Sequence, residues 1–260
     1  MHLTLPNRLA RVKHAIFLAP FGELSDPRIL ADLAAAAEER GWDGFFIWDH
    51  VNYAAPVRAV ADPWVALAAV ACATQTLRLG PMVTPLSRRR VQKVARETVT
   101  LDLLSSGRLT FGVGLGSLRN NELEPYGEVT DPRERARLLD QGLDELVRYW
   151  AGEFEPVPVQ QPRIPVWVAA VWPHRPPVRR ALRWDGVFPI RLPGPDALAE
   201  LVSEIGQSRP AGEPFDVVAE IVPGADPGPW ARAGATWIVT DIGSQPILAQ
   251  VREVIDAGPA

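Results

Sequence analysis

The stretch ETVTLDLLSSGRLTFGVGLGSLRNNE, residues 97–122, joins a predicted helix, a tight turn and a glycine-rich strand. Apolar residues recur at spacings of three and four from Val91 to Leu104, which predicts a helix with one buried stripe. Gly107 follows, and only glycine takes a left-handed helix-ending conformation without a side-chain penalty. We expect the functional site where the strand after Gly107 ends.

The predicted strand that starts at Leu109 has two unlike faces. Large apolar residues alternate with glycines from Gly112 to Gly116, and alternate residues of a strand share a face. A bare face lets a flat ligand approach the backbone, or it lets bulky neighbours pack close, and both interpretations stay open. The dinucleotide fingerprint G-x-G-x-x-G is excluded, because Ser117 or Arg119 occupies the position of its last glycine.

The pair Asp-Pro marks the start of several helices. An aspartate carboxylate can cap free N–H groups at a helix start, and the fixed φ of proline suits the first helical position. Each pair follows a candidate strand and loop, so the spacing indicates repeated strand–helix units. The pairs are Asp26-Pro27, Asp62-Pro63, Asp131-Pro132 and Asp226-Pro227.

Eight predicted strands alternate with helices along one domain, residues 1–260, without a clear linker. This alternation favours an α/β fold of the closed (β/α)8 TIM-barrel type over a doubly wound sheet. The predicted strands are residues 14–19, 44–48, 77–83, 109–115, 166–170, 186–190, 217–221 and 236–240. The predicted helices are residues 27–40, 63–73, 91–104, 131–150, 178–183, 195–205 and 227–233, with a last one ending near 255.

Composition limits the partners and the compartment. A formal charge of -4 argues against nucleic acid, and Arg88-Arg89-Arg90 is short enough to be a solvated first helical turn. The single cysteine, Cys72, excludes a disulfide within the chain and favours a reducing compartment; its apolar surroundings predict core packing. No signal-peptide pattern or membrane-length apolar run is present, so we expect a cytoplasmic protein with no membrane partner.

Several catalytic classes lack the residues they need. The four histidines show no H-x-H or H-x-x-x-H spacing, so we expect no catalytic metal. There is no G-x-S-x-G and no phosphate-binding P-loop pattern, and Lys13 and Lys93 are the only lysines for Schiff-base chemistry.

In a parallel barrel, the working residues lie in loops after the strands. His50 is the leading candidate there, because an imidazole beside a carboxylate, Asp49, can exchange protons near neutral pH. The alternative is a structural pair. His174 and Arg175 could meet a phosphate or face solvent. The other loop candidates are Phe21, Glu23, Trp48, Thr84, Ser117, Arg119, Asn120, Trp172, Arg191 and Asp241.

Residues 100–109, TLDLLSSGRL, followed by GVGLG at 112–116, resemble the signature of the luciferase-like flavin- and deazaflavin-dependent oxidoreductases. Supporting matches are residues 41–43, 48–50, 79–85, 165–170 and 184–189. The resemblance implies a compact luciferase-like TIM barrel that binds FMN or coenzyme F420. It implies hydride transfer or oxygen activation on a small organic substrate, and we include a homodimer among the expectations.

The same resemblance implies roles for particular residues. His50 matches a proton donor or base beside the reacting ring. Met82 and Val83 match a backbone bulge, often with a non-proline cis peptide, that supports the ring. Ala169 and Ala170 match a segment whose backbone N–H groups hold the cofactor phosphate. The full set of cofactor-binding candidates is Asp49, Met82, Val83, Gly114, Gly116, Asn120, Ala169, Ala170, Trp172 and Arg175.

Two departures from the family pattern limit the expected activity. Val171-Trp172 replaces glycines after the two alanines, which moves the expected phosphate contact toward Arg175. Ser117 stands where sugar-phosphate dehydrogenases of the family have a catalytic acid, so that substrate is disfavoured. The alternatives are a non-catalytic cofactor-binding protein of the same fold and a barrel lyase or isomerase without a redox cofactor.

Overall fold

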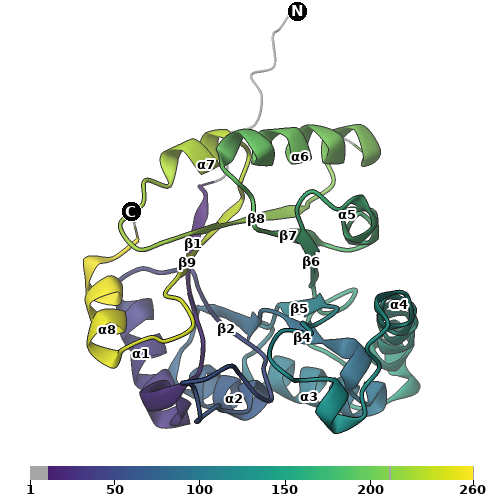
Figure 1. Cartoon of the computed structure of the whole chain (residues 1–260), viewed down its shortest axis with the longest axis horizontal. Helices are drawn as coiled ribbons and strands as arrows, with labels where there is room; N and C mark the ends of the chain where they lie inside the picture. The colour runs from purple at the N-terminus through teal and green to yellow at the C-terminus, as the bar shows by residue number, and fades with distance from the viewer. Residues whose placement is uncertain (1–10, 211, 260) are drawn as a thin grey trace, which may run out of the picture.

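Parallel strands form a ring that helices surround (Figure 1). The computed structural model describes residues 11–210 and 212–259. The strands are β1 (Lys13–Leu18), β2 (Gly44–Ile47), β3 (Arg78–Pro81), β4 (Thr84–Pro85), β5 (Phe111–Gly114), β6 (Val166–Val171), β7 (Gly186–Ile190), β8 (Asp216–Ile221) and β9 (Trp237–Asp241). The helices are α1 (Pro27–Glu39), α2 (Pro63–Ala73), α3 (Val91–Leu104), α4 (Pro132–Arg148), α5 (Arg175–Ala181), α6 (Pro195–Ser208), α7 (Gly228–Arg232) and α8 (Leu248–Ala257).

The barrel closes through a divided third strand. The sheet order is β3-β2-β1-β9-β8-β7-β6-β5-β4; the strand predicted over 77–83 forms β3 only as far as Pro81, and a second short segment, β4, follows from Thr84. Leu79 of β3 closes the ring by pairing with the residues just before β5. Its N–H donates to Arg108 O at 3.1 Å, and its carbonyl accepts from Thr110 N at 2.9 Å. The predicted closed barrel is confirmed, with nine strand segments because one strand is interrupted.

Glycines permit the close approach of the divided strand to β5. A Cβ on Gly80 would lie 1.9 Å from Thr110 O, and one on Gly112 would lie 2.3 Å from Pro81 O. At Gly112 the bare face is therefore filled by neighbouring backbone, and the ligand interpretation is wrong there.

Helix starts follow the Asp-Pro pairs. Asp26, Asp62 and Asp131 each accept a backbone N–H of the first turn, as predicted. Asp226 accepts from Gly228 N at 2.8 Å, although it lies one residue before the N-cap of α7. The helix predicted over 178–183 begins earlier, at Arg175, because its two following prolines occupy the first turn, where no N–H is required.

Two apolar clusters make up the core. The larger cluster lies between strands and helices, while the smaller one fills the inside of the barrel. There the aromatic rings of Phe46, Trp167 and Trp237 contact one another, with centroid distances of 5.3–5.9 Å. Cys72 is exposed on α2, which corrects the predicted core position; α2 is apolar all round, so its outer face also carries apolar residues. Within the described residues, no helix is long and apolar enough to cross a membrane.

One carboxylate holds the loop that leads into β3. Glu38, on α1, accepts hydrogen bonds from the backbone N–H groups of Gln75, Thr76 and Leu77 at 2.6–3.0 Å. Burial raises the pKa of Glu38, but these hydrogen bonds outweigh it and lower the pKa to about 2.

Glu38→Gln should lower the free energy of unfolding by about 1–3 kcal/mol at pH 7, because the charged acceptor of several N–H groups is lost. A carboxyl with a depressed folded pKa stabilises above its usual pKa of 4.5 and loses that contribution as the pH falls toward about 2. Urea unfolding at pH 7 and pH 3 should therefore show the difference from wild type shrinking. Glu39→Gln, an exposed neighbour, is the control, and a difference that does not depend on pH would contradict this assignment.

Candidate active site

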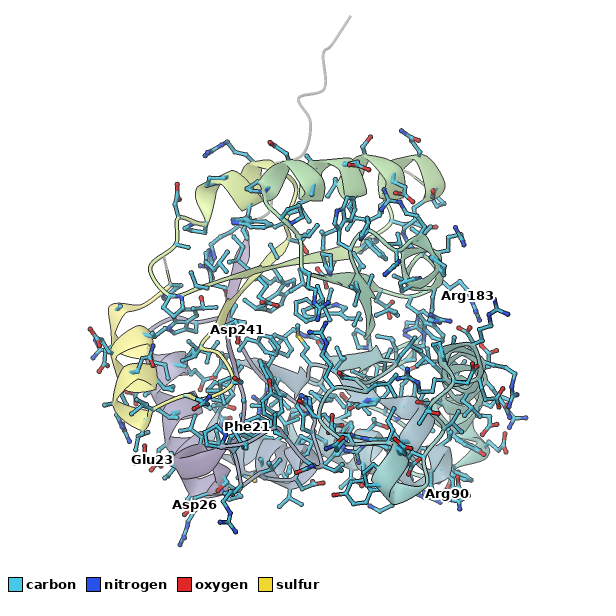
Figure 2. The ribbon with its side chains drawn as sticks, viewed as in Figure 1. Phe21, Glu23, Asp26, Arg90, Arg183 and Asp241 are labelled. Carbon is cyan, nitrogen blue, oxygen red and sulfur yellow. The ribbon has the colours of Figure 1, made fainter. Side chains whose placement is uncertain are left out.

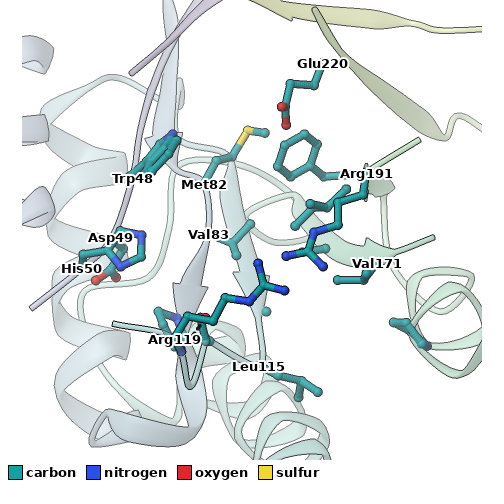
Figure 3. A pocket seen from close by; sticks show the side chains of 18 of the residues that line it. Trp48, Asp49, His50, Met82, Val83, Leu115, Arg119, Val171, Arg191 and Glu220 are labelled. Atoms are coloured by element: carbon teal, nitrogen blue, oxygen red, sulfur yellow. Dashed lines mark hydrogen bonds between the residues drawn. The ribbon is translucent and has the colours of Figure 1, made fainter. Parts of the chain in front are cut away.

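A cavity of about 710 Å³ opens at the carboxyl ends of the barrel strands. Its walls are mainly apolar, with aromatic rings from β1, from β7 and from the residue after β2, and its polar groups come from several loops and strand ends (Figure 3). A largely apolar pocket with a few converging polar groups is the usual form of a small-molecule site. The ionisable and hydroxyl side chains in the lining are Asp49, His50, Ser117, Arg119, Glu122, Arg135, His174, Arg191, Glu220 and Asp241.

A buried ion cluster lies beside the cavity, after β2. The Asp49 carboxylate accepts from Thr84 Oγ1 at 2.8 Å, Arg88 Nη2 at 2.8 Å and Arg89 Nη2 at 2.7 Å. The side chains of Arg88 and Arg89 are only 4% and 17% exposed, so the prediction of a solvated arginine turn is wrong for both. Carboxylates neutralise these two arginines, and only Arg90 reaches the outer surface (Figure 2).

Glu122 joins this cluster to His50. One carboxylate oxygen accepts from Arg88 Nη1 and from Val51 N, both at 2.9 Å, and the other lies 2.7 Å from His50 Nδ1. Burial raises the pKa of Glu122, but the hydrogen bonds and charges of His50 and Arg88 outweigh it, so the pKa lies below its usual value. The sequence prediction missed this residue; it lies 72 positions from His50, and no local pattern marks it.

The ionised Glu122 defines which nitrogen of His50 is free. A carboxylate only accepts, so Nδ1 carries the proton that it donates to Glu122, and Nε2 is left for exchange. The rings of Trp48, Phe21 and Tyr53 surround the imidazole at centroid distances of 5.7, 5.8 and 5.1 Å. The carboxylate that orients His50 is therefore Glu122, while the adjacent Asp49, expected as its partner, holds the arginines.

The interrupted strand forms one wall of the cavity. The Met82–Val83 peptide is cis, and both side chains line the cavity, at the position where the sequence predicted a backbone bulge. A Cβ on Gly114 would lie 2.7 Å from Val83 Cγ2, and one on Gly116 would lie 2.9 Å from Pro85 Cβ. The glycines therefore let this wall pack against β5.

The remaining predicted cofactor residues separate into two groups. Ala169 lines the cavity, whereas Ala170 is buried toward the helices. The Asn120 carbonyl accepts from Asn52 Nδ2 at 3.2 Å, and Asn120 is not part of the cavity lining. Trp172 and Arg175 also lie outside the lining: the Arg175 guanidinium stacks 4.5 Å above the Trp172 ring.

The expected phosphate contact from Arg175 needs correction. Its side chain forms ion pairs with Glu200 and Glu204 of α6, both at 2.8 Å, which hold it away from the cavity. Arg119 and Arg191 instead bring exposed guanidinium groups to the cavity, where both extend from their loops toward its centre (Figure 3). Neither forms an ion pair with a carboxylate in the described part of the chain, 11–210 and 212–259. His174 also lines the cavity.

Two further carboxyls line the cavity from β8 and β9. Burial raises the pKa of Glu220, the charge of Asp241 adds to the rise, and the result is about 7. Burial also raises the pKa of Asp241, although a hydrogen bond from Gly243 N opposes it. Only Asp241 was among the loop candidates; Glu220 lies within the apolar strand run VVAEI, where its inward direction depends on strand register.

Comparisons with known proteins agree with this geometry. A family model described as luciferase-like monooxygenase matches residues 8–229. The F420-dependent glucose-6-phosphate dehydrogenase of Nakamurella multipartita is 36% identical over 135 residues, which cover 49% of this chain and 38% of that protein. The limonene 1,2-monooxygenase of Rhodococcus erythropolis is 32% identical over 154 residues, which cover 57% of this chain and 38% of that protein.

Solved structures share the fold at low sequence identity. An F420-dependent secondary alcohol dehydrogenase in complex with an F420-acetone adduct has a TM-score of 0.74 at 16% identity, over 95% of this chain and 97% of that one. The FMN complex of the oxygenating constituent of 3,6-diketocamphane monooxygenase from Pseudomonas putida has a TM-score of 0.66 at 18% identity, over 83% of this chain and 68% of that one.

The chain belongs to the luciferase-like monooxygenase family. The family and the barrel predicted from the sequence are thereby confirmed. The matched part spans less than two fifths of the length of the two curated relatives.

Arg88→Met should lower the free energy of unfolding by about 3–5 kcal/mol at pH 7, because it leaves the buried Glu122 without an arginine and Asp49 with Arg89 alone. Arg90→Met is the matched control and should change stability by less than about 0.5 kcal/mol. Urea unfolding monitored by tryptophan fluorescence measures both. Equal effects of the two substitutions would show that the ion cluster does not support the fold.

Proposed function

We propose that this chain is an oxidoreductase that uses FMN or coenzyme F420 to transfer a hydride to, or activate oxygen for, a small organic substrate. The observation that carries the proposal is the His50–Glu122 pair at 2.7 Å, which aims an exchangeable imidazole nitrogen at a ligand-sized apolar cavity. The activities of two relatives, an F420-dependent dehydrogenase and a monooxygenase, support the same class.

The cavity residues fit a flavin-type cofactor. A flat ring needs an apolar slot, and Val83, Gly114 and Ala169 line one side of the cavity without long side chains. The phosphate of the cofactor needs cations, and the guanidinium groups of Arg119 and Arg191 offer them. We therefore assign the ring to the Met82–Val83 wall and the phosphate to these arginines.

When bound, the cofactor supplies the hydride or activates the oxygen. The residues of the chain supply proton transfer and orientation. His50 Nε2 accepts or donates a proton near the reacting ring, while Glu122 keeps Nδ1 protonated and stabilises the imidazolium. Arg88 balances the charge of Glu122, so the pair works without an unpaired buried carboxylate. The apolar walls exclude water from the reacting atoms.

An assay with reduced cofactor distinguishes this enzyme from the alternatives. Oxidation of reduced FMN or F420 in the presence of a substrate, measured with and without oxygen, should exceed the rate without protein and separate hydride transfer from oxygenation. Tight cofactor binding without turnover on any substrate would favour the non-catalytic binding protein. A purified protein that binds neither cofactor would favour the lyase or isomerase.

We also propose a cytoplasmic location and a homodimer. The single cysteine, exposed and without a partner for a disulfide within the chain, supports a reducing compartment. Sedimentation equilibrium at several concentrations tests the dimer.

Gly114→Val should weaken cofactor affinity by about tenfold or more while the protein still folds. The new side chain would meet Val83 Cγ2, which a Cβ alone would approach to 2.7 Å, and would push Val83 into the space assigned to the ring. Fluorescence titration with FMN and F420 measures affinity, and the unfolding midpoint reports folding. Gly206→Ala on α6, where a Cβ meets no atom within 4 Å, is the control. Unchanged affinity in a folded variant would place Gly114 away from the ring.

His50→Asn and His50→Ala should each lower turnover by about 10²- to 10⁴-fold, because asparagine retains hydrogen bonding but has no titrating nitrogen. Cofactor affinity should stay within a few-fold of wild type. His174→Asn, which changes the other histidine of the cavity, should retain turnover. If His50→Asn keeps near wild-type turnover across the pH range, His50 is a structural residue.

A further inference from the structure

Glu220 stands apart from the charged residues that build the site. It lies on β8, where Ala219 and Ile221 face the outer core and Val218 faces the inner one, so Glu220 also points inward. Its carboxyl extends into the cavity, and His50 and Asp49 lie on another side of it (Figure 3). The cavity therefore has ionisable groups on two sides, His50 on one and Glu220 on the other.

The surroundings of Glu220 leave its charge uncompensated. No hydrogen bond joins its carboxyl to residues 11–210 or 212–259, in contrast to Glu122, which accepts from an arginine, a histidine and a backbone N–H. The ionisable cavity residues that follow from the two strands paired with β8 are Asp241 at the end of β9 and Arg191 after β7. Asp241 adds negative charge, and the Arg191 guanidinium is exposed at the mouth.

This environment keeps Glu220 partly protonated at neutral pH. Burial and the charge of Asp241 raise its pKa to about 7, so the acid and the carboxylate are both populated near the working pH of a cell. A proton donor is most effective when it titrates near that pH. Ser117, at the position where some family members have an acid, cannot serve this purpose, because a serine hydroxyl is not acidic enough.

We propose that Glu220 is a catalytic acid that protonates the substrate when the enzyme reduces a carbonyl compound. This inference rests on the proposed function, in which a reduced flavin-type cofactor supplies the hydride. The hydride forms a C–H bond at the carbonyl carbon, the C=O π bond breaks, and its electron pair takes the proton of Glu220 to form O–H. Glu220 is left as a carboxylate, the cofactor is oxidised by two electrons, and a proton from solvent restores the acid.

The geometry divides the proton transfers between two residues. His50 lies beside the wall assigned to the cofactor ring, whereas Glu220 projects from β8 into the apolar remainder of the cavity. A small apolar aldehyde or ketone in that space would present its oxygen to the Glu220 carboxyl group.

Glu220→Gln tests this assignment, because glutamine has nearly the same shape but no acidic proton. With reduced FMN or F420 and a panel of small apolar aldehydes and ketones, it should lower the reduction rate by about 10²- to 10⁴-fold. Cofactor affinity should stay within a few-fold. The wild-type rate should fall as the pH rises through about 7, and the residual rate of the variant should not show this fall.

Asp241→Asn provides a matched second variant. It retains the acid but removes the neighbouring charge, so the fall in rate should move to lower pH instead of disappearing.

The pH dependence of stability provides a test that does not need turnover. Because the folded pKa of Glu220 is raised above 4.5, wild type should lose stability as the pH rises from about 4.5 through 7, and the unfolding midpoint of Glu220→Gln should change less over that range.

The outcomes separate the two proposals. No oxidation of either reduced cofactor by wild type, with or without oxygen, would overturn the proposed function. Turnover that occurs only with oxygen would leave the oxidoreductase and overturn the role of Glu220 as an acid for carbonyl reduction. Carbonyl reduction that is equally fast in Glu220→Gln, with the same fall above pH 7, would overturn the Glu220 assignment alone.

Discussion

The buried ion cluster of Asp49, Arg88, Arg89 and Glu122 is the constraint on which the site depends. It joins three segments that are distant in sequence: the end of β2, the turn after β4 and the loop after β5. Two carboxylates and two guanidinium groups balance one another, so burial is tolerated only while all four remain. The cluster leaves one oxygen of Glu122 for His50, and this contact determines the direction of the imidazole.

Barrel closure makes the cluster possible. The interruption of the third strand at Met82–Val83 lets β3 pair with β2 and β4 pair with β5, and glycines on both sides permit the approach. The turn after β4 then places Arg88 against Asp49, which follows β2. The same architecture gives two glutamates opposite environments: Glu122 is held as a carboxylate by its partners, whereas Glu220, without them, is held closer to its acid form.

Local sequence patterns predicted the parts of this structure that depend on nearby residues. Helix starts at Asp-Pro, the stop at Gly107 and the strand–helix alternation all follow from steric and hydrogen-bonding rules over a few residues. The partners of His50 and Asp49 could not be predicted, because they are 72 and about 40 positions away and meet only when the barrel closes. Arg175 was misjudged for the same reason, since its position depends on carboxylates of α6. The strand-end position beside Asp49 and the family resemblance both singled out His50, and the structure added Glu122 and Glu220.

Parallel titrations of one preparation with FMN and coenzyme F420 test the central claim most directly, namely that this cavity is a flavin-type cofactor site supported by the ion cluster. The account predicts saturable binding of at least one of them at one molecule per chain. Binding should weaken in Gly114→Val and should weaken at high salt, because arginines hold the phosphate. Absence of saturable binding by either cofactor to the folded wild-type protein would contradict the account.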